Sequence, residues 1–146
     1  MKIQRFDPTQ PATAEVQLKI ALFLEAALEE YGDPLAHIQA CLTYALGKEP
    51  NQGGAVWVAR SEDDVILGAV VVNHTHMGGY IPENILVYIA VSPQARGKGV
   101  GKKLMEAAIE QSAGSIALHV EADNPALRLY KSLGFTNKYL EMRLSK

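Results

Sequence analysis

The sequence predicts an α/β sandwich, in which helices cover one mixed β-sheet. Apolar residues recur at helical spacing in two segments of the N-terminal half, and β-rich runs bounded by turn residues follow them. Further on, a strand, a helix and a second strand succeed one another, which is the order of a right-handed parallel crossover. The 146 residues are 48% apolar, and a chain of this size forms one domain, residues 1–146, that buries about 70% of its unfolded surface.

Charge, cysteine content and hydropathy exclude several classes of protein. Fourteen basic against 16 acidic residues leave a net charge of −2, which provides no general attraction for nucleic acid. The single cysteine, Cys41, has no partner for an internal disulfide, and we expect it on the apolar side of a helix rather than as a nucleophile. No apolar run approaches the roughly 20 residues that cross a bilayer, and the first eight residues do not resemble a signal peptide. We therefore expect a cytoplasmic protein without a membrane partner.

The N-terminal half predicts one strand and two helices. Residues 2–6 read as a short strand, and residues 13–31 as an amphipathic helix. Asp33 is expected to cap a second helix that has Pro34 at its first position. The apolar faces of the two helices contain Val16, Ile20, Phe23, Leu24, Ala27 and Leu28, followed by Leu35, Ile38, Leu42, Ala45 and Leu46.

Three strands are predicted in the middle of the chain. Residues 55–60 and 65–73 flank a polar turn at 61–64, which indicates a hairpin. After a loop with two glycines, residues 84–91 form an almost continuous apolar run. Such a run is typical of a strand that is buried on both faces.

The C-terminal part alternates helices and strands. We expect a helix over 100–113, a strand over 115–120, a helix from Asn124-Pro125 to about 133, and a last strand over 139–144. The inward side chains of the first of these helices are predicted to be Leu104, Met105, Ala108 and Ile109.

The segment between the apolar strand and this helix is the most informative part of the sequence. Residues 96–103 contain four cationic side chains and no acidic one. Gly97, Gly99 and Gly101 allow a tight turn in which backbone N–H groups approach a ligand. Because the turn opens a helix, the N–H groups and the positive end of the helix dipole point to the same place. The segment therefore predicts a phosphate-binding loop, with a solvated basic helix start as the alternative.

Two familiar phosphate loops do not fit these residues. A Walker loop would need glycine where Arg96 stands and a hydroxyl residue where Lys103 stands. The dinucleotide fingerprint would need its third glycine at Lys102. The ligand is thus expected to be neither a P-loop nucleotide nor a dinucleotide.

The segment Arg96-Gly97-Lys98-Gly99-Val100-Gly101 resembles the pyrophosphate loop of the GNAT superfamily of N-acetyltransferases, Arg/Gln-x-x-Gly-x-Gly/Ala. Residues 124–135 are similar to the second cofactor motif of that family, Asn-x-x-Ala-x-x-Leu-Tyr-x-x-x-Gly-Phe, shortened by one residue before Leu129. The resemblance is specific over residues 84–144, and over the N-terminal half it concerns only the order of elements.

The resemblance implies a GNAT-like three-layer fold, with a mostly antiparallel sheet, a splayed pair of parallel strands and flanking helices. It further implies acetyl-CoA as cosubstrate and an amine acceptor. No metal is expected, because His74 and His76 have no third ligand nearby. The pyrophosphate would lie on the glycine loop, and the pantetheine arm between strands 84–91 and 115–120. Asn124 would face the arm or cap the following helix. The implied acetyl-CoA-binding residues are Ile89, Ala90, Val91, Arg96, Gly97, Lys98, Gly99, Val100, Gly101, Lys102, Asn124 and Tyr130.

By the same resemblance, Tyr130 is the general acid that protonates the departing thiolate. Its alternative role is to pack beside Phe135. We predict that replacing its hydroxyl lowers turnover while the affinity for acetyl-CoA changes little.

At the position of the general base, the sequence differs from the family pattern. Many relatives carry a glutamate on the strand before the loop, and that position falls near the apolar Ile85. Glu83 is the nearest carboxylate and is the base that we predict. Further candidates are His74 and His76, acting through water, and Glu121.

The acceptor is expected to be a primary amine of a small molecule or of a peptide or protein N-terminus. Its specificity should come from the segments 31–33, 74–83 and 136–139. Acidic residues at 29, 30 and 33 would suit a cationic amine, or form a solvated helix end. The sequence does not decide between a monomer and a homodimer. The rival hypothesis is a non-catalytic module that senses acetyl-CoA or a longer acyl-CoA.

Overall fold

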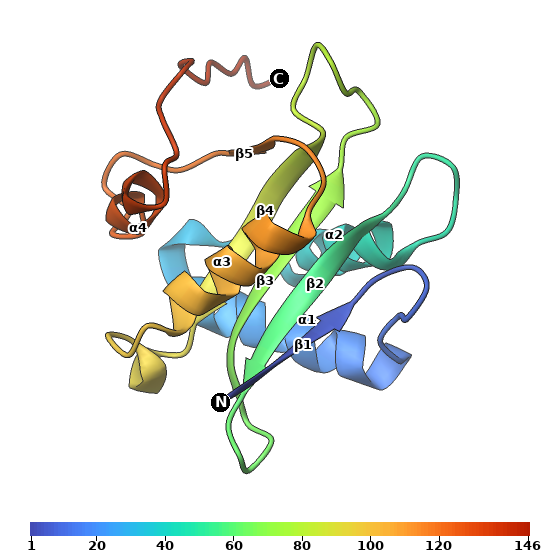
Figure 1. Ribbon diagram of the computed structural model, residues 1–146, viewed down its shortest axis with the longest axis vertical. Helices are drawn as coiled ribbons and strands as arrows, with labels where there is room; N and C mark the ends of the chain where they lie inside the picture. The colour runs from blue at the N-terminus through green and yellow to red at the C-terminus, as the bar shows by residue number, and fades with distance from the viewer.

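The computed structural model describes residues 1–146 and contains one five-stranded mixed sheet with helices on both faces (Figure 1). The strands lie in sequence order, and all neighbours are antiparallel except the last pair, which is parallel. This arrangement confirms the predicted fold class. The strands are β1 (Lys2–Phe6), β2 (Gly54–Arg60), β3 (Ile66–His74), β4 (Asn84–Val91) and β5 (Ile116–Leu118). No helix is both long and apolar enough to span a bilayer.

Helices α1 (Ala14–Leu28) and α2 (Leu35–Leu46) cover one face of the sheet. The hydroxyl of Thr13 caps α1 by accepting from the Val16 N–H, at 3.2 Å. The predicted helix 13–31 is confirmed, except that its end is a separate 3₁₀ turn, Glu29–Tyr31. The predicted Asp33 cap is wrong, because α2 begins at Leu35 without a side-chain cap.

Helix α3 (Val100–Gln111) covers the opposite face, as Figure 1 shows. Leu104 and Met105 are fully buried in the core between α3 and the sheet. Gly68 allows this packing, because a Cβ there would lie 2.8 Å from Cδ1 of Leu104. Ile109, which was expected to point inward, is 37% exposed.

The parallel strands β4 and β5 separate after three residue pairs, the last of which joins Leu86 to Leu118. The predicted strand 115–120 is therefore shorter in the structure. Asn84 holds the two strands together at their start, since its buried amide donates to the carbonyl oxygens of Ala113 at 2.7 Å and Ser115 at 3.2 Å. From this point β4 continues to Val91 along an open edge. The sheet is thus splayed as the family resemblance implied.

A β-bulge lies at the point of separation. Leu86 stands opposite Val72 and Tyr88 opposite Val71, so that Val87 has no partner on β3. Val87 is 36% exposed, and the expectation that β4 is buried on both faces is wrong at this residue.

The C-terminal segment differs most from the prediction. Helix α4 spans only Leu127–Ser132, and residues 139–144 form no strand. The apolar side chains of this segment are exposed, which is the case for Tyr139, Leu140, Met142 and Leu144. Alternation of apolar residues predicts a strand only where a neighbouring edge supplies hydrogen bonds, and β5 has just three residues. The predicted last strand is therefore absent.

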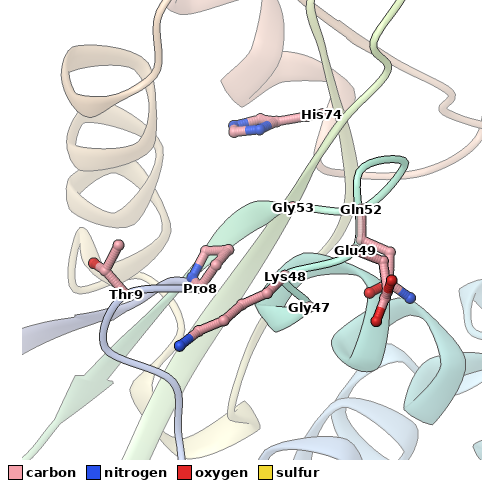
Figure 2. Close-up of a pocket in the computed structure, with 8 residues that line it drawn as sticks. All are labelled: Pro8, Thr9, Gly47, Lys48, Glu49, Gln52, Gly53 and His74. Carbon is pink, nitrogen blue, oxygen red and sulfur yellow. The ribbon is translucent and has the colours of Figure 1, made fainter.

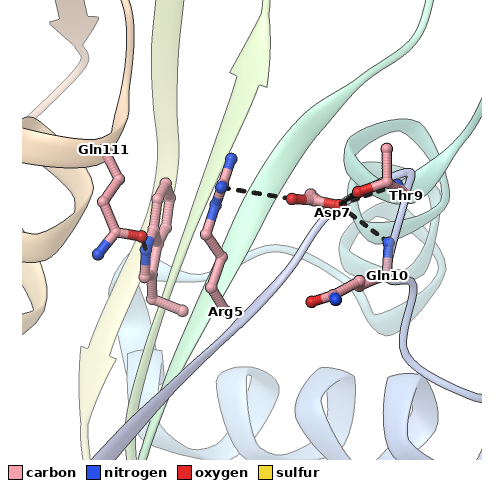
Figure 3. A network of polar contacts seen from close by, with 6 residues as sticks. Arg5, Asp7, Thr9, Gln10 and Gln111 are labelled. Atoms are coloured by element: carbon pink, nitrogen blue, oxygen red, sulfur yellow. Dashed lines mark hydrogen bonds and ion pairs between the residues drawn. The ribbon is translucent and has the colours of Figure 1, made fainter.

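A compact polar turn links β1 to α1. The Asp7 carboxylate accepts from the Thr9 N–H at 2.8 Å, the Thr9 hydroxyl at 2.7 Å and the Gln10 N–H at 2.9 Å, and it pairs with Arg5 at 3.4 Å (Figure 3). The hydrogen bond from Thr9 is the main reason that the pKa of Asp7 is lowered. These contacts fix the path of the chain from the edge of the sheet into the first helix.

Candidate active site

The glycine loop forms an open cradle at the start of α3. Gly97 and Gly99 have φ angles of +77° and +80°, in the left-handed region that favours glycine. A Cβ at either position would meet nothing within 4 Å, so the space in front of the loop is open. Gly99 is followed directly by the first turn of α3, whose N–H groups and dipole favour an anion. The geometry suits an anion such as a phosphate group.

Arg96, the first residue of the loop, is engaged with the protein. Its guanidinium donates to the carbonyl oxygen of Val91 at 3.2 Å and to that of Ala27 at 3.1 Å, and it pairs with Glu29 at 3.4 Å. Arg96 therefore braces the loop against the C-terminal end of α1. The other three cations of the loop, Lys98, Lys102 and Lys103, are exposed and make no ion pair.

The open edge of β4 lies next to the cradle. Ile89, Ala90 and Val91 pair with β3 on one side and have no β5 partner on the other. Their backbone groups on that side are available to an extended ligand, which would add to the sheet as a strand does. The edge and the cradle are continuous, since β4 leads directly into the loop.

Tyr130 lies on α4, and its side chain is buried with its ring centroid 6.0 Å from that of Phe135. Burial raises the pKa of Tyr130 to about 12. The phenol therefore stays protonated at neutral pH. The hydroxyl makes no hydrogen bond within the protein. Because its oxygen is nevertheless not among the fully buried atoms that lack a partner, it reaches the protein surface. The O–H is thus available to a ligand.

Asn124 precedes α4 and acts locally. Its side-chain oxygen accepts from the N–H of Ala126 at 2.9 Å, which closes the turn that leads into the helix. The capping role expected from the sequence is present, although it acts on the turn before α4 rather than on the helix itself.

Glu83 lies just before β4, and its carboxylate accepts from the N–H of Ser115 at 2.8 Å. It also packs on the turn at Gly114, where a Cβ would lie 2.6 Å from the carboxylate. The hydrogen bond from Ser115 lowers the pKa of Glu83. Glu83 thus joins the starts of β4 and β5, and its lowered pKa makes it a weak proton acceptor.

The histidines lie at the far end of β4 from the cradle. His74 pairs with Asn84, and its ring is edge-on to that of His76, with centroids 6.1 Å apart. Burial lowers the pKa of His74, and the His76 ring lies 2.8 Å from the carbonyl oxygen of Gln52. No group of three or more potential metal-ligating side chains occurs here or elsewhere.

Next to His74 is an open polar depression of about 470 Å³, shown in Figure 2. The depression lies where α2 and β3 end and β2 begins. None of its lining residues belongs to the glycine loop, so it does not connect the histidines with the cradle. Its lining residues are Pro8, Thr9, Gly47, Lys48, Glu49, Gln52, Gly53 and His74.

One polar pair near the separation of β4 and β5 is not predicted by the sequence. Tyr88 lies in the part of β4 that has no partner on β5, and its hydroxyl donates to Oδ2 of Asp33 at 2.5 Å. Tyr88 is buried, and burial is the main reason that its pKa is raised. The available signal was a single hydroxyl-bearing residue within an otherwise aliphatic stretch of the strand. The pairing itself joins residues 55 positions apart, which no local pattern reveals.

Comparison with known proteins supports this geometry. Residues 52–137 match the model of the acetyltransferase (GNAT) domain. The chain is 40% identical over 68 residues to mycothiol acetyltransferase of Arthrobacter sp. (strain FB24), a match that covers 43% of this chain and 21% of that protein. It is 29% identical over 80 residues to peptidyl-lysine N-acetyltransferase YjaB of Salmonella typhimurium, covering 55% of this chain and 49% of that protein. The chain thus spans from about a fifth to about a half of these relatives.

Solved structures extend the likeness to almost the whole chain. A putative acetyl transferase from Pyrococcus furiosus is 24% identical with a TM-score of 0.63, and the match covers 99% of this chain and 100% of that one. Aminoglycoside N-acetyltransferase AAC(6')-Iy in complex with CoA is 18% identical with a TM-score of 0.68, covering 99% of this chain and 95% of that one. At these identities the likeness shows the fold.

The family match covers more than half of the chain and includes the cradle, the open edge of β4 and Tyr130. With the splayed sheet and the glycine loop in place, the chain belongs to the GNAT acetyltransferase family.

Proposed function

We propose that residues 1–146 form one GNAT domain that transfers the acetyl group of acetyl-CoA to a primary amine. The acceptor is the amine of a small molecule or of a peptide or protein N-terminus. The observation that carries the proposal is the open cradle at Gly97 and Gly99, which stands at the mouth of the splay between β4 and β5. The domain acts alone or as a homodimer, without a metal, nucleic acid or membrane.

The proposed cofactor position follows the open backbone groups. The pyrophosphate lies against the first turn of α3, with Lys98 and Lys102 near its charge. The pantetheine arm extends along the free edge of β4, where its amides bond to the backbone of Ile89 and Val91. The residues proposed to bind acetyl-CoA are Ile89, Ala90, Val91, Arg96, Gly97, Lys98, Gly99, Val100, Gly101, Lys102, Asn124 and Tyr130.

The proposed reaction is a direct attack on the thioester. The neutral amine nitrogen forms a bond to the acetyl carbonyl carbon and then loses one proton to solvent, the carbon–sulfur bond breaks, and the electron pair leaves on sulfur as the CoA thiolate. The phenol of Tyr130, whose pKa is raised by burial, donates its proton to the thiolate and regains one from solvent. The ammonium form of the acceptor must first lose a proton, since an alkylamine is almost wholly protonated at neutral pH. Glu83 is the proposed acceptor of this proton, and solvent is the alternative.

The test has two stages. In thermal unfolding, we expect acetyl-CoA and CoA to stabilise the protein and ATP to have little effect. In the second stage, release of free thiol from acetyl-CoA is measured with spermidine, glucosamine and a peptide with a free N-terminus. Thiol release that depends on one of these amines supports the proposal, and stabilisation by ATP alone overturns it.

A second candidate function is a sensor that binds acetyl-CoA or a longer acyl-CoA without turnover. It is favoured by one observation: Ile85 stands near the position of the family's strand glutamate, while the nearest carboxylate, Glu83, is bonded to Ser115. Stabilisation by acetyl-CoA without thiol release from any amine in the panel would favour this function.

A further inference from the structure

Residues 87–91 of β4 have no partner on β5, and Tyr88 is the only one of them whose side chain ends in a polar group. It is 7% exposed, and its hydroxyl donates to Oδ2 of Asp33 at 2.5 Å, while Asp33 itself is exposed. The rigid phenol thus fixes the carboxylate in one place. Because the bond uses only Oδ2, the second carboxylate oxygen remains for another donor.

The segment that contains Asp33, residues 27–33, is the α1–α2 corner, and two further bonds tie it to both cofactor-binding segments. Arg96, from the glycine loop, donates to the carbonyl oxygen of Ala27 at 3.1 Å. Tyr31 donates from its hydroxyl to the carbonyl oxygen of Asp123, ahead of α4, at 3.3 Å. The corner therefore bridges the two segments on the face of the sheet opposite α3. An acceptor that reaches the thioester from that face meets the corner.

The same face contains an unsatisfied acceptor. Oδ1 of Asn73, on β3 beside Ile85, is the only buried side-chain nitrogen or oxygen without a hydrogen-bond partner. Its Nδ2 donates to Sγ of Cys41 at 3.4 Å, and Cys41 packs against the core that also contains Tyr88. An unpaired buried acceptor is costly. Because this atom is closed to solvent, it does not contact a ligand directly, and the exposed Asp33 carboxylate is the polar group that Tyr88 presents to an acceptor.

We infer that Asp33 receives the ammonium group of the acceptor and that Tyr88 is the positioning residue that holds its carboxylate in place. The inference rests on the proposed function and names its substrate class: alkyl primary amines that arrive protonated. A charge-assisted bond from the ammonium to the free carboxylate oxygen anchors the nitrogen at the corner, and the nitrogen then loses its proton to solvent or Glu83 before it attacks the thioester. Acceptors without a positive charge make no such bond.

The experiment compares variants on the amine that is most active in the panel of spermidine, glucosamine and the free peptide. For Asp33→Asn we expect the KM for the amine to rise at least tenfold, with the affinity for acetyl-CoA within twofold of wild type. Tyr88→Phe retains the ring and should raise the KM about threefold to tenfold. Because Tyr88 acts through Asp33, the double variant should be no worse than Asp33→Asn alone. Glu25→Gln removes an exposed charge from α1, outside the corner, and serves as the control, with an expected change below twofold.

The outcomes separate the inference from the proposed function. If wild type releases thiol and Asp33→Asn leaves the amine KM unchanged, the inference fails and the function stands. An equal loss of acetyl-CoA affinity in Asp33→Asn points to a structural role and also overturns it. Additive effects in the double variant remove Tyr88 from the inference. Should wild type bind acetyl-CoA yet acetylate no amine, the proposed function fails, and with it the role of Asp33.

Discussion

Single side chains at this site are defined by what they are bonded to in the fold. Tyr130, buried and without a protein acceptor, retains its proton for a ligand, whereas the carboxylate of Glu83 is already bonded to a backbone N–H. Arg96 illustrates the same point, since its guanidinium bonds to α1 and not to the open side of the loop. Residue identity alone therefore does not establish a role, and two substitutions test the roles proposed above.

Tyr130→Phe should lower turnover at least tenfold, because the departing thiolate loses its donor while the ring still packs beside Phe135. Acetyl-CoA affinity should change little. Since burial raises the pKa of Tyr130 to about 12, the wild-type rate should rise with pH as the amine loses its proton, with no decline near pH 10, where an exposed tyrosine ionises. Initial rates of thiol release across this pH range check both points. Unchanged turnover in the variant would remove Tyr130 from the mechanism.

Glu83→Gln separates a catalytic from a structural carboxylate. If Glu83 accepts the proton, turnover should fall at least tenfold, and the loss should shrink as pH rises and the free amine becomes abundant. The amide of Gln still accepts from the Ser115 N–H, so thermal stability should be nearly unchanged. Wild-type turnover in this variant would assign the proton transfer to solvent.

At the scale of elements, the site is the junction of β4 with α3. The strand is open on one side, the loop turns through two left-handed glycines, and the helix begins where the backbone N–H groups are free. Gly101 differs from these two glycines, since a Cβ there would lie in ordinary contact with the Val91 side chain, at 3.4 Å. The conformational requirement for glycine therefore lies at Gly97 and Gly99.

Gly99→Ala tests the cradle, with Gly79→Ala as its matched control. Both glycines have positive φ, +80° and +98°, and a methyl group at either position would meet no other atom within 4 Å. Each substitution should cost about 1–2 kcal/mol of unfolding free energy from backbone strain. Only Gly99→Ala should weaken acetyl-CoA binding, by at least tenfold, because its methyl group enters the space of the pyrophosphate. Urea unfolding and calorimetric titration measure the two effects. Equal affinity in both variants would place the pyrophosphate elsewhere.

At the scale of the molecule, the proposed ligand contacts elements that the protein alone holds together weakly. Strands β4 and β5 share three residue pairs, and α4 has six residues. Tyr130 of α4 already belongs to the core between α3 and the sheet, and a cofactor bound across the splay would add contacts between this core and the C-terminal part. Binding should therefore stabilise the whole domain.

Saturating acetyl-CoA should raise the unfolding temperature. At a concentration one hundred times Kd, binding adds about 2.7 kcal/mol, which corresponds to roughly 5–10 °C for a domain of this size. Thermal unfolding with increasing acetyl-CoA measures the shift, and ATP at equal concentration is the control. No shift at concentrations where titration shows binding would mean that the ligand also binds the unfolded chain.

Most of the secondary structure follows from the sequence alone. Apolar periodicity predicted α1, α2 and α3, and the bounds of β1 and β4 agree with the prediction residue for residue. These segments are long, strongly patterned and bounded by proline, glycine or polar turns, so that local preference and tertiary packing coincide. The glycine loop is predictable for the same reason, because its local residues impose its backbone geometry.

The splay, the C-terminal segment and the partners of the polar side chains depend instead on tertiary packing. The alternating residues 139–144 would make a strand beside a long edge, and β5 does not provide one. Asp33 was expected to cap a helix 12 residues long and bonds instead to Tyr88, while Arg96 bonds to Ala27 across 69 positions. A hydrogen bond between distant residues depends on how the elements pack. The sequence determines which side chains can form hydrogen bonds, and tertiary packing determines which of them come within bonding distance.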